Sequence, residues 1–187
     1  MKLYEIIKSY TPKNTQEEKD KEAFLRFLES DALHFNRDNL GGHITVSAWI
    51  VNSEKTKVLF CYHNIYNSWS WVGGHADGEE DLLSVAVKEA YEETGVSVKS
   101  IYDGIFSLEI LPVSGHMRKG SYVPSHIHYN ITYLVEADES AALKNKPDEN
   151  SAVMWIPTDK IAEYSTEEWM VKNIYSKMDP YTVNEIR

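Results

Sequence analysis

Three glutamates in one short segment have the spacing of a cation-binding helix face. Glu89, Glu92 and Glu93 occupy positions i, i+3 and i+4, so on a helix they fall within an arc of roughly 100°. Like charges at this spacing repel each other by about 0.2–0.5 kcal/mol per pair. A hard, oxygen-preferring cation such as Mg²⁺ relieves that repulsion, and once bound it can activate water and neutralise charge on phosphate groups. A solvated acidic helix face is the alternative interpretation of the glutamates alone.

Glycines on both sides of this segment favour the cation-binding interpretation. Gly73, Gly74 and Gly78 precede a predicted helix over residues 82–94, and they let the backbone turn tightly or approach a ligand closely. Gly95 follows the last helical residue, in the position where a glycine ends a helix. A glycine-rich acidic loop, a short helix with clustered carboxylates and a glycine stop together predict a compact unit that holds a cation.

Residues 74–96 resemble the Nudix box. That pattern is a glycine, five residues, a glutamate, seven residues, Arg-Glu, an aliphatic residue, any residue, Glu-Glu, any residue, a glycine and an aliphatic residue. The chain departs from it at Lys88, where the family has arginine, so a flexible point charge replaces a planar fork that can hold two carboxylates. The matching residues are Gly74, Glu80, Glu89, Ala90, Glu92, Glu93, Gly95 and Val96.

The resemblance implies a Mg²⁺-dependent hydrolase, with Mn²⁺ as a substitute ion. It implies that Glu92 and Glu93 bind the metal and that Glu89 is a further ligand or the base that takes a proton from water. Glu80 would support the site, and the backbone carbonyl of Gly73 would be an extra metal ligand.

Further candidate residues lie outside the box. Glu149 is in a polar loop six residues before Trp155, where several Nudix hydrolases place an acidic residue as an extra ligand or general base. A solvated loop glutamate is the alternative. His126 and His128 alternate in a predicted strand, so they share a face and could contact phosphate or take up a proton. Aromatic residues before the box could stack on a base, although packing is the commoner role of each: Tyr66, Trp69 and Trp71.

The predicted reaction is attack of a metal-activated water on a phosphorus of a nucleoside diphosphate linked to another group. A nucleotide sugar such as ADP-ribose and a nucleoside triphosphate are the candidate substrates. Two alternatives stay open. One is a non-catalytic nucleotide sensor built on the same domain, although sensors tend to lose the glutamates. The other is a diphosphate isomerase, whose catalytic cysteine at the start of the box is replaced here by Gly73-Gly74-His75.

Periodicity and turn residues predict the elements that must position these side chains. The interleaving of strands with few helices predicts an α/β fold, and the resemblance implies a Nudix-like α/β/α sandwich with a mixed sheet. We expect a single domain over residues 1–187 whose first 40 residues are an N-terminal helical extension, with Thr15 and Glu18 in capping-box form. The predicted elements are helices at 15–30, 82–94, 158–164 and 166–177, a hairpin over 43–63, strand-rich segments at 97–111 and 126–137, and a strand at 152–156.

Composition and charge narrow the partners and the compartment. The 19 basic and 29 acidic residues give a net charge of −10, which disfavours general binding to nucleic acid. No apolar run approaches the roughly 20 residues that cross a bilayer, the N-terminus has no signal-peptide pattern, and Cys61 is the single cysteine. We therefore expect a cytoplasmic enzyme that acts on a small nucleotide-like molecule and binds neither nucleic acid nor membranes. A homodimer through the N-terminal helix is compatible with the sequence.

Overall fold

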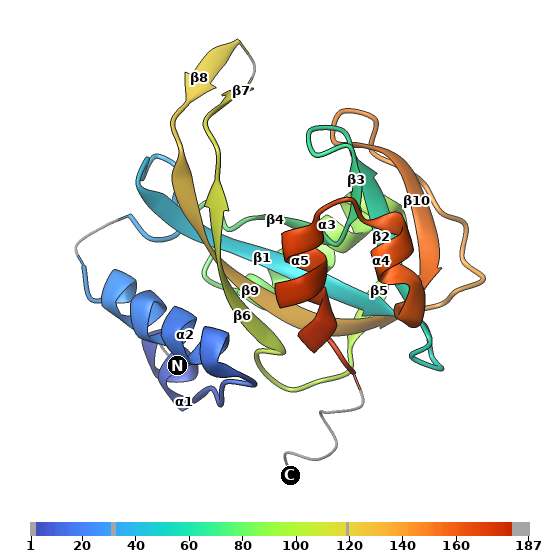
Figure 1. Cartoon of the computed structure of the whole chain (residues 1–187), viewed down its shortest axis with the longest axis horizontal. Coiled ribbons are helices and arrows are strands. Elements are labelled where there is room, and N and C mark those ends of the chain that lie inside the picture. The colour runs from blue at the N-terminus through green and yellow to red at the C-terminus, as the bar shows by residue number, and fades with distance from the viewer. Residues whose placement is uncertain (1–2, 31–32, 119, 181–187) are drawn as a thin grey trace.

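One strongly curled mixed sheet organises the chain (Figure 1). The computed structural model describes residues 3–30, 33–118 and 120–180. The main strand order is β10-β2-β1-β9-β5, while β3 pairs with β2, β4 with β1 and β6 with β9. The strands are β1 (Gly42–Val51), β2 (Lys57–His63), β3 (Ser68–Ser70), β4 (Val72–His75), β5 (Val98–Ser100), β6 (Ser107–Val113), β9 (His126–Ala137) and β10 (Asn150–Pro157).

The central strand β1 has two different partners on one of its edges. It runs parallel to β9 along its whole length, and every one of its residues is buried, as expected for a strand with both faces covered. On its other edge β1 meets β2 only at Val51↔Val58, while β4 pairs antiparallel with it from Thr45↔His75 to Ala48↔Val72. The predicted hairpin over 43–63 therefore forms only at its turn, because β4 pairs with β1 farther along the same edge.

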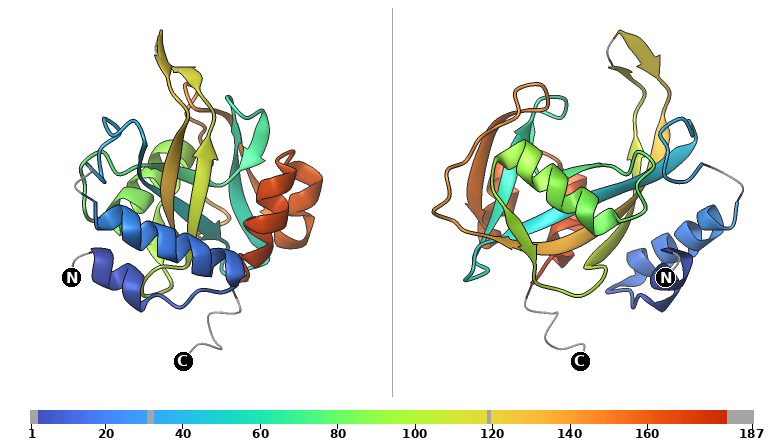
Figure 2. Two further views of the ribbon diagram at one scale, coloured as in Figure 1. Left: turned by 60° about the vertical axis from the view of Figure 1, so that its left-hand side comes forward. Right: turned by 180° about the vertical axis from the view of Figure 1, so that it is seen from behind.

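Helices cover both faces of the sheet, which confirms the predicted α/β sandwich (Figures 1 and 2). Helix α3 (Leu82–Thr94) lies on one face, over an apolar cluster that includes Val46 and Ala86. On the other face the short helices α4 (Ile161–Tyr164) and α5 (Glu168–Asn173) and the 3₁₀ turns η1 (Thr158–Lys160) and η2 (Tyr175–Lys177) enclose a second cluster around Trp49. A small hairpin, β7 (His116–Arg118) and β8 (Ser121–Val123), projects beyond the sheet.

The N-terminal helices α1 (Leu3–Ser9) and α2 (Thr15–Leu28) pack on the sheet at β6 (Figure 2). Ile7 and Phe24 are fully buried, so this extension contributes apolar side chains to the core of the chain. The predicted capping box at Thr15 and Glu18 is wrong, because the N-cap is Asn14, whose side chain accepts a hydrogen bond from the backbone of Glu17 (2.9 Å). In the described part of the chain no helix is long and apolar enough to span a membrane.

A buried ionic network ties the first and last elements to the sheet. The Lys177 Nζ lies 2.9 Å from Glu17 Oε1 and 3.2 Å from Glu109 Oε1, and both glutamates are fully buried. Ser107 Oγ donates to Glu17 (2.7 Å) and Asn130 Nδ2 donates to Glu109 (2.9 Å). The network therefore joins α2, β6, β9 and η2, which are far apart in sequence.

The pKa shifts of Glu17 and Lys177 define the pH range in which this network stabilises the fold. Burial alone would raise the pKa of Glu17, but the charge of Lys177 and three hydrogen bonds outweigh it and hold the pKa below its usual 4.5. Burial alone would lower the pKa of Lys177, but Glu109 and Glu17 outweigh it and hold the pKa above its usual 10.5. The contribution of this network to the free energy of unfolding is therefore complete between pH 4.5 and pH 10.5, the ordinary pKa values of the two groups. It is lost as pH falls below the first or rises above the second.

We predict that Lys177→Met lowers the free energy of unfolding by about 3–5 kcal/mol at pH 7, because two buried carboxylates lose their counter-charge. The loss should shrink as the pH falls towards 4, since protonation neutralises those carboxylates. Urea titrations across this range measure it. Lys19→Met is the matched control, because the Lys19–Glu22 pair is exposed and its removal should leave the stability nearly unchanged. Equal losses in the two variants would contradict the role of the network.

Candidate functional site

Helix α3 carries the acidic residues and matches its predicted bounds. Its N-cap is Asp81, whose side chain accepts a hydrogen bond from Ser84 N (3.2 Å). It ends at Gly95 in the left-handed conformation (φ 75°), as predicted. Its buried face includes Leu82 and Val85, whereas Leu83 and Val87 are half-buried. This face brings Glu93 into the interior (3% exposed) and leaves Glu92 at the surface.

The main chain of β4 runs directly against these carboxylates. Gly73 N donates a hydrogen bond to Glu93 Oε1 (3.1 Å). A Cβ at Gly74 would lie 2.5 Å from the Glu89 carboxyl carbon, and a Cβ at Gly73 would lie 2.4 Å from the Val46 carbonyl oxygen. Only glycine fits at either position without displacing a neighbour. Gly74 is therefore what allows β4 to approach α3, and Gly73 is what allows it to approach β1.

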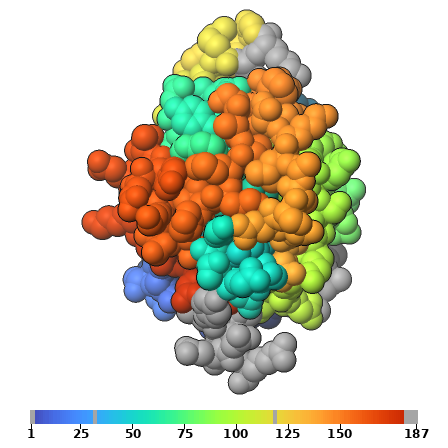
Figure 3. Space-filling model, turned by 90° about the vertical axis from the view of Figure 1, so that its right-hand side faces the viewer, coloured from blue at the N-terminus to red at the C-terminus, as the bar shows by residue number. Residues whose placement is uncertain are grey.

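Three carboxylates converge beside this strand. Oxygen atoms of Glu89, Glu93 and Glu149 lie within 4.8 Å of one another. The loop that carries Glu149 is fixed by two hydrogen bonds, from Asn64 N to the Glu149 carbonyl (3.0 Å) and from Asn150 Nδ2 to the Glu93 carbonyl (3.2 Å). This loop and β10 lie on the surface between α3 and the C-terminal helices (Figure 3).

The electrostatics of the cluster favour a bound cation. Burial is the main cause that raises the pKa of Glu93 to about 8, with the charges of Glu149 and Glu89 adding to it against the Gly73 hydrogen bond and Lys146. Burial, followed by the charge of Glu92, also raises the pKa of Glu89. A divalent ion would offset both desolvation and repulsion. The cluster thus supplies oxygen donors and an uncompensated negative charge, which is the chemistry that Mg²⁺ or Mn²⁺ requires.

Other predicted box residues lie outside this cluster. Glu92 is exposed and forms ion pairs with Lys88 (3.6 Å) and Lys146 (3.4 Å). Lys88 is exposed as well, so its contact with Glu92 is an ordinary surface pair. Glu80 is exposed in the turn before α3. The structure therefore brings the predicted residues Glu89, Glu93 and Glu149 together, and Glu92 is not among them.

The aromatic candidates have different surroundings. Trp69 packs edge-on against Tyr62 (5.5 Å between ring centroids). Trp71 packs edge-on against Tyr175 (5.6 Å) at the border of the second apolar cluster. Tyr66 is 48% exposed and stacks on His63. Of the three, Tyr66 is the side chain with a free ring surface, while the tryptophans are largely engaged in packing.

Histidines from three strands gather on the face of the sheet opposite α3. The predicted pair, His126 and His128, is joined there by His43 from β1 and His75 from β4. The sequence showed the alternation of the β9 pair, but not its neighbours, because these are set by the parallel register of β1 and β9. Burial and the neighbouring imidazoles lower the pKa of His128 to about 2, so its ring is neutral.

Comparison with known proteins gives a single family. A model of the NUDIX domain matches residues 41–177. The human protein named m7GpppN-mRNA hydrolase NUDT17 is 29% identical over 107 residues, which are 54% of this chain and 33% of that protein. A hydrolase of CMP-5′-(N-acetyl-N-hydroxy-3-aminopropyl)phosphonate from Streptomyces rubellomurinus is 28% identical over 118 residues, 61% of this chain and 52% of that protein. The chain thus spans a third to a half of these relatives.

Solved structures share the fold. A NUDIX family hydrolase from Clostridium perfringens aligns with a TM-score of 0.51 and 24% identity, over 73% of this chain and 96% of that one. The dihydroneopterin triphosphate pyrophosphohydrolase of E. coli gives a TM-score of 0.52 and 13% identity, over 73% and 94%. An Ap4A hydrolase from C. elegans gives 0.52 and 17%, over 75% and 98%. At these identities the likeness shows the fold.

We predict that Gly74→Ala and Gly73→Ala fail in different ways. The methyl group at position 74 meets the mobile end of Glu89, so the variant should stay folded but bind Mn²⁺ at least about tenfold more weakly. The methyl group at position 73 meets the β1 backbone, which should cost about 1–3 kcal/mol of stability. Thermal unfolding and Mn²⁺ titration separate the two effects. A Gly74→Ala variant with unchanged Mn²⁺ affinity would contradict the placement of Glu89 in the site.

Proposed function

The chain belongs to the Nudix family, and we propose that it is a divalent-metal-dependent hydrolase of a diphosphate bond in a nucleotide-like small molecule. The observation that carries this proposal is the convergence of Glu89, Glu93 and Glu149 beside the glycines of β4. The match to the NUDIX domain and the hydrolase names of both relatives support it.

The proposed division of roles follows from burial. Glu93, which is buried and oriented by Gly73 N, and Glu89 would hold Mg²⁺, with Mn²⁺ as a substitute. The bound ion supplies positive charge against the diphosphate and lowers the pKa of a coordinated water. The Glu149 side chain is 42% exposed, whereas Glu93 is buried, so Glu149 would take the proton of the attacking water. Lys146, 3.0 Å from Glu149, would hold that carboxylate in place.

The substrate class is inferred from the relatives and from charge. The two relatives' names both describe a nucleotide linked through phosphorus to another group. A nucleotide sugar such as ADP-ribose and a nucleoside triphosphate fit this chemistry, with Tyr66 as the side chain placed to stack on a base. The net charge of −10 disfavours a long nucleic acid as the substrate.

The isomerase alternative loses support at Cys61. This thiol is 1% exposed, its Sγ faces the Glu93 carbonyl (3.9 Å), and burial raises its pKa far above the ordinary range. A thiol in that position is a core side chain and does not meet a substrate.

The direct test is hydrolysis of nucleotide sugars, dinucleoside polyphosphates and nucleoside triphosphates, with Mg²⁺ and with excess EDTA. We expect one class to be turned over only with the metal, and Glu93→Gln to abolish that turnover while remaining folded. If no class is hydrolysed, the proposal is wrong and a nucleotide sensor becomes the better explanation. Turnover that excess EDTA leaves unchanged would instead contradict the metal dependence. Binding of the same panel by calorimetry would then identify its ligand.

We predict opposite outcomes for two conservative variants on the acidic surface. Glu149→Gln should lower kcat by about 10²–10⁴-fold, because the proton acceptor is gone. Glu92→Gln should change kcat by less than about tenfold, since Glu92 is paired with two lysines outside the cluster. Steady-state kinetics on the best substrate measure both. The reverse order of losses would restore Glu92 as the functional carboxylate.

A further inference from the structure

The histidines on the face of the sheet opposite α3 form a second cluster, which differs in chemistry from the carboxylate cluster. His43 in β1 is the register partner of His128 in β9, and His75 in β4 is the register partner of Thr45, two residues along β1. Directly paired residues, and residues two apart on one strand, project to the same face of a sheet. The register alone therefore directs three imidazoles from three adjacent strands to one point.

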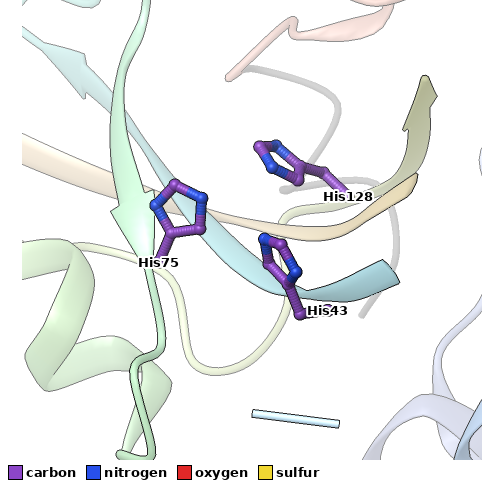
Figure 4. A group of neighbouring side chains, drawn as sticks. All are labelled: His43, His75 and His128. Carbon is purple, nitrogen blue, oxygen red and sulfur yellow. The ribbon is translucent and has the colours of Figure 1, made fainter. Parts of the chain in front are cut away.

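The three rings face one another closely (Figure 4). Every pair among His43, His75 and His128 has ring centroids 5.0 Å apart, and one nitrogen from each lies within 4.8 Å of the others. Three imidazoles on a tetrahedral zinc ion have Zn–N distances of about 2.0–2.1 Å, which places their nitrogens roughly 3.3 Å apart. Small side-chain rotations would close the observed triangle to that size.

His43 carries a buried nitrogen that lacks a partner. The residue is 4% exposed, and its Nδ1 lies 3.3 Å from the Asn39 carbonyl oxygen, to which it can donate. Its Nε2 is buried with no hydrogen-bond partner in the described part of the chain. Leaving a buried acceptor unpaired is unfavourable. An imidazole that donates one N–H to a backbone carbonyl and presents the other nitrogen as a lone pair has the arrangement of a metal ligand.

His126 is placed to orient His128. Its Nδ1 lies 2.9 Å from the Pro124 carbonyl oxygen, and its Nε2 lies 3.1 Å from the Nε2 of His128. If His126 donates through Nδ1, its Nε2 accepts a hydrogen bond from the Nε2–H of His128, so the Nδ1 of His128 keeps its lone pair. His126 would thus be a positioning residue for the ligand beside it.

We propose that His43, His75 and His128 bind a divalent late transition metal ion, with Zn²⁺ as its representative, at a site separate from the carboxylate cluster. Three neutral imidazoles without a carboxylate select borderline metals such as Zn²⁺ over Mg²⁺, which prefers oxygen ligands. Three protein ligands leave the fourth tetrahedral position for water or for an oxygen of another molecule. The proposal stands on the histidines alone and does not require the hydrolase activity.

The test is Zn²⁺ binding to the full chain, produced without a histidine tag and stripped with a chelator that is then removed. Competition with a chromophoric chelator should show one Zn²⁺ per chain, and Co²⁺ in its place should give the visible spectrum of a tetrahedral nitrogen site. His75→Gln and His128→Gln should each weaken binding by at least about tenfold, and His126→Ala by about 10–100-fold. His63→Gln, outside the cluster, should leave binding unchanged.

Two controls keep the outcome decisive. His43 is the most deeply buried ligand, and its substitution could disturb folding. The variants are therefore made at the partly exposed His75 and His128, and circular dichroism confirms that each variant folds. Glu93→Gln should retain the Zn²⁺ site while losing Mg²⁺-dependent turnover, which separates this proposal from the hydrolase. Absence of Zn²⁺ binding, or binding that His75→Gln and His128→Gln leave unchanged, would overturn it.

Discussion

The backbone of β4 lies so close to helix α3 that a side chain cannot fit between them. Gly74 makes that approach possible, and the carboxylate of Glu93 is buried against the amide of Gly73. Burying a carboxylate is costly without compensation, and one amide compensates only in part, so the pKa of Glu93 rises to about 8. The same constraint gives β4 a place on the β1 edge, and thereby sets the position of His75 at its end. The candidate carboxylate site and the histidine cluster both depend on this one contact.

Local features of the sequence predicted much of the fold. Helix α3 and its glycine stop follow from periodicity and from the αL preference of Gly95, and β2 ends at His63, where the predicted hairpin segment ends. The orientation of α3 about its own axis was harder to predict, because apolar and small residues occur on more than one side of the helix and each side could face the sheet. Which rotation occurs depends on what packs against the helix. That contact buries Glu93 and exposes Glu92, although the two are neighbours in a motif that treats them alike.

Long-range pairings account for what local reasoning missed. Strand β4 begins Val-Gly-Gly, a run with little strand preference, and it forms because β1 offers a free edge. The parallel register of β1 and β9 places His43 beside His128, and Lys177 reaches two glutamates whose positions are more than 60 residues away. Nothing in the local pattern near these residues encodes their partners. In contrast, Glu149 was predicted from its place before a strand, and the structure brings it to Glu89 and Glu93.

The central claim is that the metal-binding carboxylates are Glu89 and Glu93 with Glu149 beside them. The most direct measurement is anomalous diffraction at the manganese edge from crystals grown with Mn²⁺. The account predicts a peak within coordination distance, about 2.0–2.2 Å, of carboxylate oxygens of both Glu89 and Glu93, with Glu149 on the same side. A peak held by Glu92 with Glu93 uninvolved, or no peak beside β4 at millimolar Mn²⁺, would contradict it.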